Sequence, residues 1–297
     1  MNRRGVTILE VLIVVAILGL LVGLTLAAVQ KVRSAGMRTQ NANNLRQIAL
    51  GMHTLFAKGD GGLTELLKSD MSQESLVGTR SLFFRLLPIV HREPVYTDGM
   101  SAAQVNENFR PNISVYRNPG DPSYEYGEFF EGRYGKCSYA MNVFAMNGAV
   151  DLTSSIPDGT SATLMTVDKY YAWCEATGGR SGYLVRVTWH DYSELENPRK
   201  TKPYGARRAT FADAGWGDVV PTTDPMTHTT RPSILGKMFQ VAPRPELVDP
   251  TIPSTPFTAG LTAAFFDGSV RTIAPGVDPG AFWAAVTPAG GEVVSLD

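Results

Sequence analysis

The sequence has few of the side chains on which most active sites depend. Among its 297 residues there are only 2 cysteines and 4 histidines. No two histidines form a close pair or the HExxH pattern of zinc enzymes, and phosphate-binding, dinucleotide-binding and serine-nucleophile motifs are absent. We therefore expect no catalytic residues, no metal site and no cofactor, and a protein that is not an enzyme.

Excess charge and long apolar runs are equally scarce. The 27 basic and 28 acidic residues give a formal net charge of −1, which offers no electrostatic footprint for nucleic acid. One long apolar run, at the N-terminus, is too little for a polytopic membrane protein. The 29 glycines and 19 prolines are too few for a collagen-like or disordered chain and indicate a loop-rich, β-rich body.

The one long apolar run covers residues 11–29. It carries no charge, and Thr25 is its only polar side chain. A helix of this length measures about 28 Å, enough to cross the hydrocarbon core of a bilayer. The apolar region of a cleaved secretory signal is shorter, about 7–15 residues. The run therefore predicts a transmembrane segment.

Basic residues flank this segment on both sides. Arg3 and Arg4 precede it and favour a cytoplasmic N-terminus, whereas Lys31, Arg33 and Arg38 follow it. The first flank usually dominates, and a large domain is translocated regardless of nearby charge. We expect a single-pass inner-membrane protein with an extracytoplasmic head.

Glu10 stands directly before the apolar run. A lone carboxylate inside a bilayer costs about 2.5–3.5 kcal/mol on insertion scales, so it needs a cation at the same depth. Cleavage between Gly5 and Val6 would create one, because it frees the amine of Val6. That amine on one subunit can then pair with Glu10 of its neighbour. The alternative is that Glu10 lies at the headgroup edge and needs no partner.

The residues around this junction resemble a known signal. An Arg-Arg-Gly leader, an apolar residue, threonine, two aliphatic residues, Glu10 and then the apolar run resemble the class III prepilin signal of type IV pilins and type II secretion pseudopilins. The resemblance implies cleavage after Gly5 by prepilin peptidase, N-methylation of Val6, and assembly with copies of itself or other pilins. The sequence departs from the usual pattern at Val6, where Phe or Met is common, and at Ala27, where proline often kinks the helix.

The helix is expected to continue beyond the membrane. From Leu45 to Phe56 apolar residues recur at the spacing i, i+3, i+4 and i+7, which predicts one apolar face. Asn43, Asn44 and Arg46 are among the residues expected on the polar faces. A glycine-rich run at 59–62 ends the helix. The expected organisation is a prepilin leader at 1–5, a long helix at 6–57 and a globular head at 58–297.

The head is expected to be α+β, with a pilin-like antiparallel β-sheet and long loops packed on the helix. Its best hairpin signal is Asp267-Gly268 between two β-prone runs. Short helices are expected at 63–69 and 81–87, the second stopped by Pro88. The expected strands are 113–116, 138–141, 163–167, 183–189, 261–266 and 269–273. Residues 197–256, rich in proline, threonine and charge, indicate long loops.

A second resemblance spans nearly the whole chain. Short motifs in a fixed order are similar to those of the prepilin-like family known as domain of unknown function 1559. They occur at 43–48, 118–122, 138–142, 156–161, 266–271 and 290–294. The resemblance implies a pilin-like head. The family usually has Cys and His at the positions of Asn118 and Phe257, so neither position carries that chemistry in this chain.

Candidate sites in the head are few. Cys137 and Cys174 can form one disulfide in an extracytoplasmic head, and two buried free thiols are the alternative. Carboxylates can hold Ca²⁺, and a calcium loop like that of type II major pseudopilins is a weak prospect at Asp213, Asp218 and Asp224. Sugar stacking is a further weak prospect, less favoured than core packing, at Tyr170, Tyr171 and Trp173.

Two functional classes are consistent with these features. The favoured one is a structural subunit, major or minor, of a type IV pilus or type II secretion-type filament. Its partners would be prepilin peptidase, the inner membrane and other pilins, with no nucleic acid. The alternative is a single-pass membrane-anchored protein whose head binds a polysaccharide or another surface ligand and which never polymerises.

Overall fold

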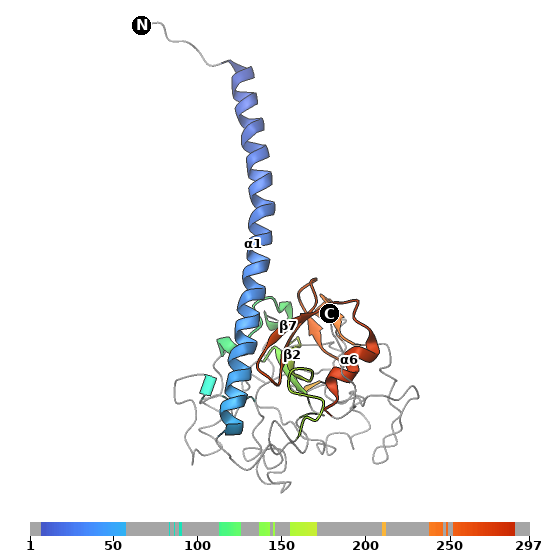
Figure 1. Cartoon of the computed structure of the whole chain (residues 1–297). Coiled ribbons are helices and arrows are strands. Elements are labelled where there is room, and N and C mark those ends of the chain that lie inside the picture. The colour runs from blue at the N-terminus through green and yellow to red at the C-terminus, as the bar shows by residue number, and fades with distance from the viewer. Residues whose placement is uncertain are drawn as a thin grey trace, which may run out of the picture.

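The computed structural model shows a long helix whose N-terminal half stands out from the head (Figure 1). It describes residues 7–57, 83, 86, 89–90, 113–125, 137–142, 145, 155–170, 210–211, 238–245, 248 and 252–288. The helix and the antiparallel strands that it packs on make this an α+β, pilin-like fold. The fold class expected from the sequence is therefore confirmed.

Helix α1 runs without interruption over Ile8–Ala57. At 1.5 Å per residue it is about 75 Å long. Thr25 is the one polar side chain within the apolar run. Its hydroxyl donates to the carbonyls of Leu21 and Val22 at 3.0 and 2.9 Å, so this side chain is hydrogen-bonded within the helix. Its N-terminal half projects away from the head, and its C-terminal half lies along it (Figure 1). The residues of α1 that the head buries are Asn41, Asn44, Leu45, Ile48, Ala49, Gly51 and Met52.

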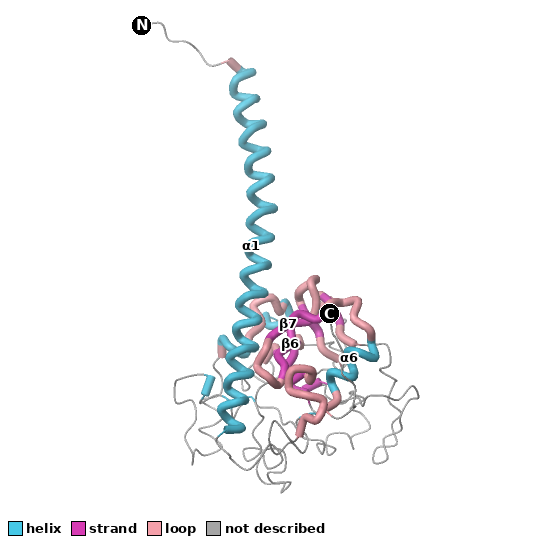
Figure 2. Tube along the Cα trace, viewed as in Figure 1, coloured by secondary structure: helices cyan, strands magenta, loops and turns pink. Residues whose placement is uncertain are grey.

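Among the described residues the head holds a five-stranded sheet with the order β3-β1-β2-β6-β7, whose strands are drawn in magenta in Figure 2. Its strands are β1 Tyr139–Asn142, β2 Leu164–Asp168, β3 Thr210–Phe211, β6 Leu261–Phe265 and β7 Val270–Ile273. All neighbours are antiparallel except β1 and β3, which pair in parallel. A separate parallel pair joins β4 Gln240–Val241 to β5 Ser254–Thr255. Helix α6, Pro279–Val286, begins at Asp278, whose carboxylate accepts from the N–H of Ala281 at 3.0 Å.

Both faces of the sheet are covered, because side chains alternate between them along each strand. On one face Tyr139, Met141 and Met165 pack with the α1 residues Leu45 and Ile48. On the other face the strand residues pack against α6, and this group includes Ala140, Leu164, Val167, Leu261, Phe265, Phe282 and Trp283. The sheet is thus the middle layer between α1 and α6.

Four expected strands are present with bounds shifted by about one residue, and one is wrong. The hairpin of β6 and β7 turns at Asp267-Gly268 as expected, with φ of 85° at Gly268. Residues 113–116 instead form the 3₁₀ turn η1, Ser114–Tyr116, because the N–H of Tyr116 bonds to the carbonyl of Ile113 within the turn. The hydroxyl of Tyr116 also donates to the carbonyl of Phe83 at 2.5 Å, which holds the turn against the core.

The other expected elements are only partly described. Phe83 and Leu86 are helical and buried, as expected for the segment 81–87, and Ile89 and Val90 are helical as well, beyond the expected stop at Pro88. The expected helix at 63–69 and the strand at 183–189 lie outside the described residues, as does most of the segment 197–256.

We expect Gly260→Ala to destabilise the head by at least about 2 kcal/mol. Gly260 has φ of 131°, and a Cβ there would collide with the carbonyl oxygen of Ile273 on the paired strand. Gly276 provides a matched control, since a Cβ there meets nothing within 4 Å. Thermal unfolding of the detergent-solubilised chain, followed by near-UV circular dichroism, measures the difference. Equal melting temperatures for Gly260→Ala and Gly276→Ala would contradict this prediction.

Candidate functional site

The candidate processing and assembly site lies at the start of α1. Gly5 and Val6 lie outside the described residues, so cleavage between them stays a prediction. Glu10 is described and fully exposed in the first turn of α1. Within the described part of the chain no cation lies within ion-pair distance of its carboxylate.

Thr7 and Glu10 form a reciprocal cap at the start of α1. The N–H and the hydroxyl of Thr7 donate to Oε2 of Glu10 at 2.8 and 3.0 Å, and the N–H of Glu10 donates to Oγ1 of Thr7 at 3.3 Å. This is a capping box, which satisfies helix N–H groups that have no partner within the helix. The pattern threonine, two residues, glutamate before an apolar run carries this signal in the sequence, and our sequence reasoning missed it.

The apolar residues that follow are uncovered. Every large aliphatic side chain from Ile8 to Val32 is at least half exposed, from 51% at Ile13 to 81% at Ile8. The helix is long and apolar enough to cross a membrane. An apolar surface of this extent is stable only against lipid or other apolar helices.

A buried polar junction fixes α1 to the head. It consists of Asn41 and Asn44 on α1, Tyr139 on β1 and Asp168 on β2, which is paired with Tyr139 across the two strands. The hydroxyl of Tyr139 donates to Oδ1 of Asn41 at 2.8 Å, and Nδ2 of Asn41 donates to Oδ1 of Asp168 at 2.9 Å. Nδ2 of Asn44 donates to the carbonyl of Arg117 at 2.8 Å. Asn44 was expected on a polar face, but these partners bury it.

Asp168 is the central acceptor of the polar junction and is completely buried. Its carboxylate accepts from Asn41, from the hydroxyl of Thr255 at 3.1 Å and from the N–H of Thr262 at 3.3 Å. Burial raises the pKa of Asp168 to about 7, although these hydrogen bonds act in the opposite direction. Burial, followed by the charge of Asp168, raises the pKa of Tyr139, whose hydroxyl therefore stays protonated as a donor.

The raised pKa of Asp168 predicts a pH-dependent stability. Between its usual pKa of 3.8 and about 7, the folded chain keeps the proton that the unfolded chain loses. The free energy of unfolding should therefore fall as pH rises from about 4 to about 7, by at most about 4 kcal/mol, and change little above that. Thermal melts of the wild type and of Asp168→Asn across this range test it. The variant should lose this slope, so an unchanged slope would exclude Asp168 as its source.

The short motifs that resemble the domain of unknown function 1559 family have structural roles where the structure describes them. Asp121 closes its own turn by accepting from the N–H and hydroxyl of Ser123 at 2.9 and 2.6 Å, and it accepts from the hydroxyl of Ser138 at 2.7 Å. Gly120 lies under the ring of Phe257, where a Cβ would come within 2.9 Å of a ring carbon. Asn118 and Phe257, where the family usually has Cys and His, are both buried.

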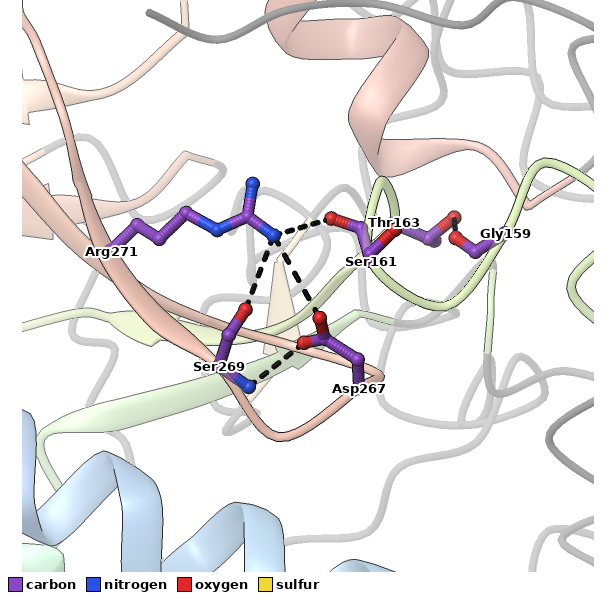
Figure 3. A network of polar contacts seen from close by, with 6 residues as sticks. All are labelled: Gly159, Ser161, Thr163, Asp267, Ser269 and Arg271. Atoms are coloured by element: carbon purple, nitrogen blue, oxygen red, sulfur yellow. Dashed lines mark hydrogen bonds and ion pairs between the residues drawn. The ribbon is translucent and has the colours of Figure 1, made fainter.

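The motifs at 156–161 and 266–271 meet at the edge of the sheet formed by β7 (Figure 3). Arg271 on β7 donates to the carbonyl of Ser161 at 2.7 Å and to the hydroxyl of Ser269 at 3.2 Å, and lies 3.9 Å from the carboxylate of Asp267. Its guanidinium also stacks 4.1 Å from the ring centre of Phe265. The arrangement joins the β6–β7 hairpin to the loop before β2, and we assign it to stability because all its contacts are internal to the head.

The remaining candidates are described only in part. Cys137 is buried, its Sγ donates to the carbonyl of Tyr139 at 3.5 Å, and burial raises the pKa of its thiol. Cys174 lies outside the described residues, so the bond between the two stays a prediction. Tyr170 is buried beside Val248, which agrees with core packing rather than sugar stacking. The described residues contain no group of three metal-ligating side chains. The other candidates, Tyr171, Trp173, Asp213, Asp218 and Asp224, lie outside the described part.

Comparison with known families agrees with the start of the chain. The family described as the prokaryotic N-terminal methylation motif matches residues 1–26. Comparisons with curated proteins and with solved structures find no match. The narrower resemblance to the domain of unknown function 1559 family stays a prediction. The matched segment holds the leader, Glu10 and most of the apolar run, which α1 presents uncovered. The chain therefore has a pilin-like fold and carries the prepilin N-terminal methylation motif on a helix that is long and apolar enough to cross a membrane.

Proposed function

We propose that the protein is a structural subunit of a type IV pilus or a type II secretion-type filament. Prepilin peptidase cleaves it after Gly5, and the amine of Val6 is methylated. It sits in the inner membrane with a cytoplasmic N-terminus and an extracytoplasmic head until it joins a filament of its own copies or of other pilins. It acts without catalytic residues and without a resident cofactor.

The observation that carries this proposal is Glu10 at the head of an uncovered apolar helix. Its hydrogen bonds within the described chain come from Thr7, a neutral partner. A carboxylate drawn into the apolar layer is costly unless it meets a cation. A neighbouring subunit with a free amine at Val6 supplies that cation at the same depth when the helices pack side by side.

Electron microscopy of surface or periplasmic filaments, with mass spectrometry of their purified subunits, tests this proposal. Peptides of the head in the filament fraction, in proportion to the filament mass, would support a structural subunit. A chain found only in the membrane fraction of cells that do make filaments would favour the anchored binding protein instead.

A further inference from the structure

We propose that the segment of α1 between the membrane and the head is a binding surface for anionic phospholipid headgroups. This segment, residues 30–40, is named the neck here. The inference rests on the proposed membrane insertion of α1 and goes beyond the proposed filament role.

Most of the neck is uncovered, and only Ser34 and Met37 are half-buried. None of its residues is buried, and the first residue of α1 that the head buries is Asn41. At 1.5 Å per residue the neck is about 16 Å long. The head therefore begins well beyond the end of the apolar run, and in Figure 1 this part of α1 is seen free of the head.

The neck is cationic and its helix offers no compensating acid. Lys31, Arg33 and Arg38 are all exposed, and Glu10 is the sole acidic residue of α1. Necks of neighbouring copies in the same membrane would lie at the same depth and repel one another. A partner at this depth must be anionic and must reach a helix that the heads do not cover, which lipid phosphates do.

The spacing along α1 matches a bilayer. Glu10 and Lys31 are 21 residues apart, about 32 Å along the helix, close to the hydrocarbon thickness of about 30 Å. Lys31 and Arg33 then stand about 3 and 6 Å beyond Val29, inside the headgroup layer. Helical side chains slant toward the N-terminus, so Arg38, about 13 Å beyond Val29, also points back toward the membrane.

Spin-label electron paramagnetic resonance of the full chain in phosphatidylcholine vesicles tests the proposal. Labelled phosphatidylglycerol and labelled phosphatidylcholine are compared as probes of the lipid that the protein immobilises. We expect about threefold or greater preference for phosphatidylglycerol, reduced by 0.5 M salt, roughly the range in which screening becomes strong. The triple variant Lys31→Gln, Arg33→Gln, Arg38→Gln should lose most of it.

Arg46→Gln is the matched control. Arg46 is exposed on the same helix, donates to Oδ1 of Asn43 at 3.0 Å, and lies about 22 Å beyond Lys31. That separation exceeds the screening length of about 8 Å at physiological salt, so this variant should keep the preference. An unchanged preference in the triple variant, or none in the wild type, would overturn the neck as a lipid site. Absence of immobilised lipid of either kind would overturn the membrane anchoring itself.

Discussion

Glu10→Ala should leave membrane insertion largely intact and abolish or strongly reduce incorporation into filaments. In the proposed filament, removal of the carboxylate would leave the Val6 amine of the neighbour without a counter-ion in a low-dielectric helix bundle. By analogy with broken buried ion pairs this costs about 3–5 kcal/mol per subunit. Glu10→Leu should insert at least as well as the wild type, because it makes the start of the span more apolar.

The capping box provides the controls for this experiment, since Glu10 has two separable roles. Glu10→Gln keeps an acceptor for Thr7 but removes the charge, whereas Thr7→Val removes the hydroxyl of the cap and keeps the charge. If the ion pair matters, Glu10→Gln assembles as poorly as Glu10→Ala and Thr7→Val assembles nearly normally. Amounts in membrane and sheared-filament fractions measure this. Equal amounts in the sheared fraction for all variants would exclude the filament role.

Gly5→Leu should block processing, so that the chain retains Met1 and carries no N-methyl-Val6. Glycine has no Cβ and lets the backbone approach a protease site closely, and a leucine side chain at the scissile bond removes that access. Gly5→Ala adds one methyl group and should retain much of the cleavage. N-terminal mass spectrometry distinguishes the products. A mature wild-type chain that begins at Met1, or just after Ala28 as a secretory signal would, contradicts prepilin processing.

Comparison of Gly5→Leu with Glu10→Ala also separates processing from assembly. Uncleaved Gly5→Leu offers no free amine at Val6, so it should also be missing from filaments. Glu10→Ala should instead be cleaved and methylated and still be missing from them. A variant at Glu10 that loses cleavage as well would place Glu10 in recognition by the peptidase rather than in packing between subunits.

Local signals in the sequence predicted the elements whose structure depends on neighbouring residues. The apolar periodicity and the glycine run placed α1 at 6–57, and the observed helix is Ile8–Ala57. The Asp267-Gly268 pair predicted the β6–β7 hairpin because this turn needs a residue that accepts positive φ. Both features are set by a few consecutive residues and leave a pattern in the chain.

Burial and conformation that depend on residues far away in the sequence could not be predicted from local patterns. Asn44 has the composition of an exposed helix face, yet it is buried because carbonyls at 114 and 117 and the hydroxyl of Tyr139 meet it there. Asp168 looks like the end of an ordinary strand until its donors, Thr255 and Thr262, arrive from more than 80 residues away. The strand expected at 113–116 is a 3₁₀ turn for a similar reason, because Tyr116 is held by Phe83.

The polar junction and the unbroken α1 together make the protein a lever. The helix carries no proline, which is a common cause of sharp kinks, and it runs unbroken from the apolar segment to the head. Asn41 and Asn44 hydrogen-bond the head to α1, so we expect the head to follow a tilt of the helix. A tilt of about 20°, ordinary for a membrane helix, carries the far end of a 75 Å rod sideways by about 25 Å. We therefore expect a force that tilts the membrane segment during extraction from the bilayer to displace the head as well.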